Sequence, residues 1–160
     1  MLAVVIPCFR VRRHILEVLA AVPTSVGRVY VVDDACTEGT GDLVESGCRD
    51  PRVKVLRHST NQGVGGATIT GYRAALADGA RIVVRLDGDG QMDPADVPAL
   101  IKPLKQGLAD YTKGNRYFSP RALKAVSGVF EKNPKIDRVR LFGSRAMGTH
   151  KEGSDVDLAL

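Results

Sequence analysis

Short apolar runs alternate with helical patterns along residues 2–106, and this alternation constrains the fold more than any other feature of the sequence. The apolar runs cover residues 2–6, 29–32, 53–56 and 82–86, and the helical patterns cover residues 12–21, 42–46, 67–77 and 95–106. Apolar runs of this kind, bounded by turn residues, are typical of buried parallel strands. Strands that alternate with helices form a parallel sheet with right-handed crossovers. We therefore predict an α/β fold with a mainly parallel sheet flanked by helices.

Four other features of the sequence carry weaker patterns. Residues 61–66, NQGVGG, predict a flexible, glycine-rich loop that opens the helix at 67–77. Pro7 is expected to end the first strand, and Pro103 is expected to kink or shorten the last helix. Residues 111–113 indicate one further short strand.

A proline and two acidic segments follow three of the predicted strands at the point where each strand ends. They are Pro7, the pair Asp33-Asp34, and the segment Asp87-Gly88-Asp89. The carboxyl ends of parallel strands share one edge of the sheet, and ligands bind beyond that edge. The sequence therefore predicts one binding site built from all three segments.

The segment after the fourth strand, Asp87-Gly88-Asp89-Gly90-Gln91, indicates a metal site. Two carboxylates one residue apart at the exit of a buried strand are costly unless a positive charge lies between them. Mg²⁺ commonly takes one or two carboxylates together with substrate phosphates. Asp93-Pro94 then predicts a helix start, with Asp as N-cap and Pro at the first helical position. The alternative is a plain acidic turn between a strand and a helix.

Composition narrows the class of protein. The chain has 160 residues, of which 44% are hydrophobic and 26% charged, and its net charge is +5. The positive charge suits a phosphate-bearing partner, but basic residues are scattered and not interleaved with aromatic ones, so nucleic acid is not expected. Cys8, Cys36 and Cys48 lack metal-site spacing and are expected to be reduced thiols. We expect neither a signal peptide nor a membrane span, and a cytoplasmic location.

Five blocks in order carry a family resemblance. VVIPCFR, VVDDACTEGT, NQGVGGA, LDGDGQMDP and DYTKGNRYF resemble family 2 glycosyltransferases of the GT-A fold, over residues 1–118. Among these, the chain looks most like polyprenyl-phosphate sugar transferases of the dolichyl-phosphate mannose synthase type. One departure is that Arg10 and Arg13 stand near the position where many relatives carry an Asn-Glu pair.

The resemblance implies a donor, an acceptor and a cofactor. The donor is a nucleoside diphosphate sugar, the acceptor is a lipid-linked phosphate, and the location extends to the membrane surface. The residues implied in donor binding are Pro7, Asp33, Asp34, Asp87 and Gly88, and those implied in binding Mg²⁺ or Mn²⁺ are Asp87, Asp89 and Gln91. The chemistry agrees, because a bridging cation neutralises the charge that develops on a diphosphate leaving group. No catalytic base is identified.

The pattern changes after residue 118. Gly143-Ser144 opens a turn at a predicted helix N-terminus, and Asp155 and Asp157 share one face of a predicted strand. This segment, residues 119–160, resembles the front part of minimal nucleotidyltransferases of the DNA polymerase beta superfamily. By that resemblance, Gly143 and Ser144 bind a triphosphate, and Asp155 and Asp157 bind metals. A third carboxylate, expected on a later strand, is not in the sequence, so this segment is expected to be truncated. The glycosyltransferase segment is also expected to be truncated, because in the family it resembles the acceptor site and a catalytic base lie after the GNR-F block.

Three functional hypotheses stay open. The first is a metal-dependent glycosyltransferase module, the second is a nucleotidyltransferase, and the third is an inactive nucleotide- or metal-binding fusion fragment. A natural fusion, an assembly artefact and a deliberate chimera all give such a sequence. His14, His58 and His150 lack metal-ligand spacing and are interpreted as structural or solvent-facing, and Cys8 as a buried filler.

Overall fold

The structure is a computed structural model that describes residues 1–114. The chain divides into two compact units, Met1–Val97 and Pro98–Leu160, and each is described by itself. The first unit contains the sheet and all the residues that the site below requires.

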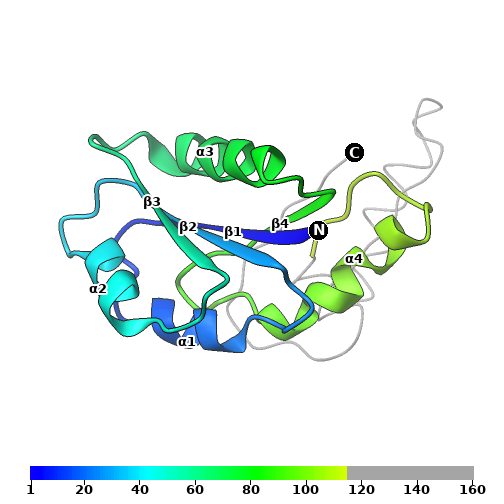
Figure 1. The fold of residues 1–160 in the computed structure, drawn as a ribbon, viewed down its shortest axis with the longest axis horizontal. Coiled ribbons are helices and arrows are strands. Elements are labelled where there is room, and N and C mark those ends of the chain that lie inside the picture. The colour runs from blue at the N-terminus through cyan, green and yellow to red at the C-terminus, as the bar shows by residue number, and fades with distance from the viewer. Residues whose placement is uncertain (115–160) are drawn as a thin grey trace, which may run out of the picture. The chain divides into compact units, whose positions relative to one another are not determined.

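The first unit is built on a sheet of four parallel strands, in the order β3-β2-β1-β4 (Figure 1). The strands are β1 (Leu2–Cys8), β2 (Arg28–Asp33), β3 (Val53–Arg57) and β4 (Ile82–Arg85). The chain moves outward from β1 through β2 to β3 and then returns to place β4 on the other side of β1. The predicted parallel α/β fold is confirmed, and the reversal between β1 and β4 is the point where such sheets bind ligands.

Helices cover both faces of the sheet. Helix α3 (Gly63–Ala77) lies on one face, and α1 (Ile15–Ala21) and α2 (Thr40–Gly47) lie on the other (Figure 1). Both faces of β1 and β2 are therefore buried, which is why their sequences are continuously apolar rather than alternating.

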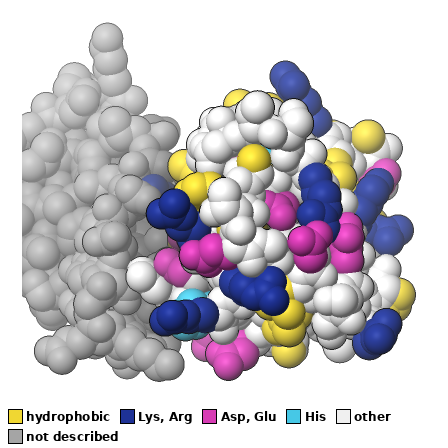
Figure 2. Space-filling view, turned by 90° about the vertical axis from the view of Figure 1, so that its left-hand side faces the viewer, with side chains coloured by type: hydrophobic (Ala, Val, Ile, Leu, Met, Phe, Trp, Pro, Cys, Tyr) yellow, Lys and Arg dark blue, Asp and Glu magenta, His cyan; other side chains and the backbone are white. Residues whose placement is uncertain are grey.

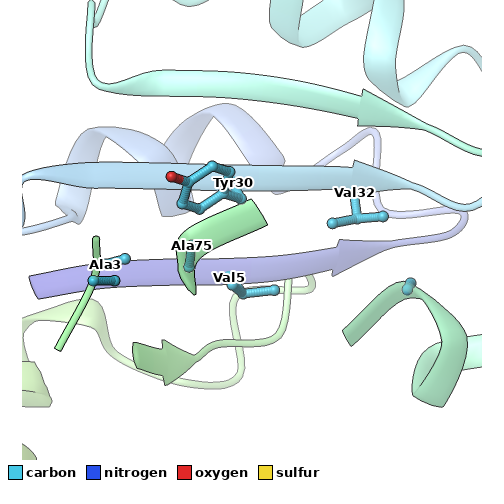
Figure 3. Packing of buried hydrophobic residues seen from close by; sticks show 7 residues of the cluster. Ala3, Val5, Tyr30, Val32 and Ala75 are labelled. Carbon is cyan, nitrogen blue, oxygen red and sulfur yellow. The ribbon is translucent and has the colours of Figure 1, made fainter. Parts of the chain in front are cut away.

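The core under α3 is made of small and β-branched side chains around one tyrosine. Figure 3 shows members of this cluster, Ala3, Val5, Tyr30, Val32 and Ala75. Helix α3 approaches the sheet so closely that a Cβ at Gly71 would lie 2.3 Å from Val5 Cγ1. Glycine at this position is thus required by the packing of the helix on β1.

The sequence predicts a flexible loop at residues 61–66, and this prediction is wrong for most of the segment. Helix α3 begins at Gly63, four residues before the predicted start. The segment is ordered because Asn61 Oδ1 accepts the Gly63 N–H at 3.0 Å and the Gln62 N–H donates to Asp34 at 2.8 Å. Tertiary contacts from the end of β2 therefore outweigh the local flexibility of the glycines.

The predictions for the first strand and first helix also need correction. Pro7 does not end β1 but lies within it, paired in register with Val32. Its missing N–H is tolerated because the pairing of β1 with β4 stops at Val5, two residues earlier. Helix α1 begins at Ile15 rather than at residue 12, since residues 12–14 form a turn.

The predictions for residues 93–113 are confirmed in part. Asp93 caps a short 3₁₀ helix, Pro94–Asp96, by accepting the Ala95 N–H at 2.9 Å, as its sequence predicts. Helix α4 (Val97–Lys105) follows and ends two residues after Pro103, as expected of an internal proline. Residues 111–113 form no strand, and the Thr112 hydroxyl instead donates to the Leu100 carbonyl at 2.8 Å.

Candidate functional site

A pocket of about 340 Å³ lies at the carboxyl ends of β1, β2 and β4. Its volume is in the range of small-molecule sites. The residues that line it are Pro7, Cys8, Phe9, Val11, Asp34, Asn61, Gly63, Val64, Ala67, Asp87, Gly88 and Asp89. Figure 2 views the side of the molecule at which the strands end, where acidic and basic side chains lie intermixed. The structure therefore brings together Pro7, Asp34 and the Asp87–Asp89 segment, as the sequence predicts.

Asp33 is the one residue of the two acidic segments that does not line the pocket. Its buried carboxylate instead faces the start of α2, where it accepts the Cys36 N–H and the Gly41 N–H, both at 2.8 Å. Arg57 Nη1 lies 3.9 Å from the same carboxylate. A Cβ at Gly41 would come within 2.5 Å of Asp33 Oδ2, so glycine is needed for this approach. Asp33 thus ties β2 to α2.

Arg57 reinforces this junction from the end of β3. Its guanidinium bonds Asp42 and Glu45 of α2 at 2.8 Å each. These hydrogen bonds to carboxylates raise the pKa of Arg57. Arg57 is therefore engaged with α2 and is not a charge directed at the pocket.

Asp34 lines the pocket, and both its backbone and its carboxylate are hydrogen-bonded. Its backbone N–H donates to the Cys8 carbonyl at 3.0 Å, and its backbone carbonyl accepts from Asn61 Nδ2 at 3.1 Å. Its carboxylate Oδ1 lies 2.6 Å from His58 Nδ1 and accepts the Gln62 N–H. Burial acts to raise the pKa of Asp34, but these hydrogen bonds outweigh it and hold the pKa below the ordinary 3.8. The carboxylate is therefore ionised at neutral pH.

His58 is interpreted from the sequence as structural or solvent-facing, and the structure shows that its side chain is not solvent-facing. It is buried between Asp34 and α3, where its Nε2 lies 2.9 Å from the Thr70 hydroxyl. The strand register explains the contact between His58 and Asp34. Asp33 of β2 pairs with Arg57 of β3, so the residues that follow them, Asp34 and His58, lie side by side. The signal was therefore present in the sequence as a histidine directly after the strand that neighbours β2.

Asp87 and Asp89 have far fewer partners than Asp34. Asp87 Oδ1 contacts Arg85 Nη2, and Asp89 Oδ1 accepts the Gln91 N–H at 3.0 Å. About a third of the Asp87 side chain is exposed. Gly88, between them, packs so tightly that a Cβ there would lie 3.0 Å from Val11 Cγ2. The glycine keeps the two carboxylates at the wall of the pocket.

The donor set fits a hard divalent cation only in part. Two carboxylates on the pocket wall match the one or two that Mg²⁺ takes when substrate phosphates complete its shell. Gln91 is exposed and does not line the pocket. Among residues 1–114, no group of three or more His, Cys, Asp or Glu side chains could hold a metal by itself. A cation here would therefore depend on a bound phosphate for its remaining ligands.

The thiols near the pocket differ in acidity. Cys8 is buried, and burial together with nearby Asp33 raises its pKa well above the ordinary thiol value. The thiol is therefore protonated, which agrees with a filler rather than a nucleophile. Burial also acts to raise the pKa of Cys36, but hydrogen bonds from Thr40 and the Arg10 N–H bring it below the ordinary value.

The candidate residues of the second predicted segment, Gly143, Ser144, Asp155 and Asp157, lie outside the described residues. In the part of the chain that is described, none of the helices is long and apolar enough to span a membrane.

Comparison with known proteins gives a consistent family. A sequence model of the family described as "Glycosyl transferase family 2" matches residues 3–146. The undecaprenyl-phosphate mannosyltransferase of Micrococcus luteus is 41% identical over 97 residues, which are 60% of this chain and 38% of that protein. The polyprenol monophosphomannose synthase of Mycolicibacterium smegmatis is 32% identical over 118 residues, 71% of this chain and 44% of that protein. This chain thus spans less than half the length of either relative.

A solved structure supports the same fold. S. aureus TarS 1-349 in complex with UDP-GlcNAc is 26% identical, with a TM-score of 0.51 over 62% of this chain and 30% of that chain. The sheet and its flanking helices are therefore of the GT-A type that the sequence blocks indicate.

Proposed function

Because the chain belongs to glycosyl transferase family 2, we propose that its pocket binds a nucleoside diphosphate sugar for hexosyl transfer to a polyprenyl phosphate. The observation that carries the proposal is the pocket itself, at the end of a parallel sheet. Its lining includes the hydrogen-bonded carboxylate of Asp34 and the carboxylates of Asp87 and Asp89, which have few partners. Support for the donor class comes from TarS, whose structure is in complex with UDP-GlcNAc. Support for the acceptor class comes from relatives named for undecaprenyl phosphate and dolichyl phosphate.

Each wall of the pocket has a part in the proposed site. Asp34 accepts N–H or O–H groups of the nucleoside, while Pro7 and Gly88 form surfaces against which it packs. Asp33 supports this wall from behind, through its bonds to the start of α2. The sequence-based assignment of Asp33 to donor binding stays a prediction.

Asp87 and Asp89 are proposed to hold Mg²⁺ or Mn²⁺ against the diphosphate, with Gln91 as a further predicted ligand. When bound, such a cation neutralises the charge that develops on the leaving nucleoside diphosphate. Arg85, which pairs with Asp87, adds a fixed positive charge beside these carboxylates.

The proposed transfer needs no general base from the protein. An oxygen of the acceptor phosphate is already ionised at neutral pH, and its electron pair forms the new bond to the anomeric carbon. The bond from that carbon to the donor phosphate breaks, and the nucleoside diphosphate leaves with the electron pair. The work left to the protein is to orient the donor and to exclude water.

A lipid acceptor suggests action at the cytoplasmic membrane surface. Two apolar side chains that line the pocket, Phe9 and Val64, are 42% and 60% exposed. Exposed apolar groups at the mouth of a site suit a substrate that carries a hydrocarbon chain.

Calorimetry of the full chain with UDP, GDP and UDP-N-acetylglucosamine, in MgCl₂ and then in EDTA, tests the proposal. We expect binding that tightens about tenfold with Mg²⁺, equivalent to about 1.4 kcal/mol, and loss of this gain in Asp89→Ala. Glu17→Gln, which removes an exposed carboxylate of α1, serves as control and should retain the gain. Equal affinity in both buffers would overturn the metal, and no binding of any probe would overturn the donor class.

A second candidate function rests on the pattern of residues 119–160. The turn predicted at Gly143-Ser144 and the Asp155/Asp157 pair of the sequence are what supports a nucleotidyltransferase-like segment joined to the glycosyltransferase module of residues 1–118. The family match runs to residue 146 and so overlaps this segment. Transfer from a labelled nucleoside triphosphate that disappears in Asp155→Asn would support it. Absence of both transfer reactions, with nucleotide binding retained, would favour an inactive binding module.

A further inference from the structure

The polar chain Asp34–His58–Thr70 links the ends of β2 and β3 to α3, and His58 has no part in the function proposed above. Resting on that proposed function, we propose that His58 is a positioning residue, which orients the Asp34 carboxylate for donor binding. His58 does not line the pocket, so it would act through Asp34 alone.

The geometry of His58 leaves its ring little freedom. Its backbone N–H donates to the Asp33 carbonyl at 2.9 Å, which continues the ladder between β2 and β3. Both ring nitrogens are engaged, Nδ1 with Asp34 Oδ1 at 2.6 Å and Nε2 with the Thr70 hydroxyl at 2.9 Å. The side chain is only 6% exposed. Packing and hydrogen bonds together therefore determine the ring orientation.

The positions of the protons follow from the partner atoms. An ionised carboxylate can only accept, so His58 Nδ1 carries the proton that faces Asp34. In the neutral ring, Nε2 is then an acceptor, and the Thr70 hydroxyl donates to it. The Asp34 carboxylate thus selects the tautomer, in the way that a buried partner fixes the tautomer of a catalytic or metal-binding histidine. The Thr70 hydroxyl, which can donate or accept, adapts to that tautomer and holds the second ring nitrogen.

The contacts of His58 and Gln62 are both made to one oxygen of the Asp34 carboxylate, Oδ1. The nearby Gly63 N–H, which donates to Asn61 Oδ1 at 3.0 Å, also helps to lower the pKa of the Asp34 carboxyl. Asp34 lines the pocket, and Oδ2, which neither His58 nor Gln62 holds, is the oxygen that we expect to accept a donor group of a bound nucleotide. Without His58, the carboxylate could rotate about its last torsion and lose this direction.

Three substitutions separate positioning from packing. His58→Leu removes both ring contacts and should weaken UDP or GDP binding in MgCl₂ by about tenfold, the effect of one charge-assisted hydrogen bond. His58→Asn places an amide N–H near the position of Nδ1 and should restore affinity to within about threefold. Thr70→Val releases only Nε2 and should weaken binding by about threefold.

A matched control addresses general loss of stability. Tyr30→Phe removes another buried hydrogen bond, 2.6 Å from the hydroxyl to Asp78, at a site that does not line the pocket. It should lower Tm but leave nucleotide affinity unchanged. A carbon-13 NMR titration of Asp34 in the ligand-free chain adds a readout independent of nucleotide, since loss of the His58 bond should raise the pKa of Asp34.

The outcomes distinguish this inference from the function on which it rests. Weak binding by His58→Leu, with normal binding by His58→Asn and Tyr30→Phe, supports it. Wild-type affinity in His58→Leu, equal losses in His58→Leu and Tyr30→Phe, or failure of His58→Asn to restore binding overturns it. If the wild-type chain binds none of the probes, the proposed function fails and this role in binding fails with it, while the titration still reports whether His58 controls Asp34.

Discussion

Asp33-Asp34 and Asp87-Gly88-Asp89 follow β2 and β4 at the same edge of the sheet, yet the protein surrounds them in opposite ways. The Asp34 side chain is 3% exposed and that of Asp33 is 5% exposed, whereas Asp87 is 32% exposed. The first pair accepts four hydrogen bonds from N–H groups of the protein. Asp87 and Asp89 accept one each.

This difference separates a preformed wall of the pocket from one that a ligand must complete. Buried carboxylates are stable only when hydrogen bonds replace their hydration, and the first pair meets that condition without a ligand. Asp33 and Asp34 therefore form a closed pair. Asp87 and Asp89 form an open pair, which keeps water contact and lone pairs that a cation and a phosphate can use. Two acidic motifs of similar appearance are thus suited to orientation in one case and to charge neutralisation in the other.

The largest expected effect is loss of stability in Asp33→Ala. The substitution leaves the partly buried Cys36 N–H and the buried Gly41 N–H without an acceptor, so we expect the free energy of unfolding to fall by about 3 kcal/mol. Asp89→Ala, in the open pair, should cost less than about 0.5 kcal/mol. Urea denaturation of both variants measures the contrast. Equal losses would show that the two pairs are not held differently.

The next effect is acid sensitivity that depends on Asp34. Its pKa in the folded chain is below 3.8, so the unfolded chain takes up the proton first as the pH falls. The stability from this carboxylate is therefore fully present well above pH 3.8 and is lost as the pH falls through the lower, folded pKa. Asp34→Asn should reduce the decline in Tm below about pH 4. A decline as steep as that of the wild type would contradict this account.

The fold was largely predictable from sequence, whereas the difference between the acidic pairs was not. Apolar runs and their spacing predicted the parallel strands, and the ends of those strands predicted Pro7, Asp34 and Asp87 at one edge. Strand boundaries failed at Pro7 because its tolerance depends on where β4 stops pairing. The partners of each carboxylate depend on register and on loops that fold back, as with Gln62 and His58, and no local pattern encodes these.

A smaller effect is expected from Arg85→Met at the open pair. Arg85 Nη2 contacts Asp87 Oδ1, which a cation would otherwise use. Arg85 Nε is buried without a hydrogen-bond partner, so the Arg85–Asp87 ion pair leaves one donor of the guanidinium unsatisfied. Since a partly exposed ion pair is worth about 1 kcal/mol or less, its removal should tighten Mn²⁺ binding to the ligand-free chain by up to about fivefold. Electron paramagnetic resonance of free Mn²⁺ measures this change. Weaker binding would mean that Arg85 orients Asp87 for the cation.

The smallest effect concerns the residue that follows each pair, where both loops adopt the left-handed backbone conformation. The open pair has Gly90 there, with φ of 79°, but the closed pair has Ala35, with φ of 55°. Alanine in this conformation costs roughly 1 kcal/mol more than glycine, and glycine loses about half of that gain through the entropy of the unfolded chain. Ala35→Gly should therefore stabilise the chain by about 0.5 kcal/mol, while Gly90→Ala should destabilise it by a similar amount.

Ala35→Val, which introduces a β-branched side chain, should lower the free energy of unfolding by more than about 1 kcal/mol. If Ala35→Gly instead lowers Tm, the strain at this loop is offset by contacts of the Ala35 methyl group, and the closed pair depends on side-chain packing as well as on hydrogen bonds.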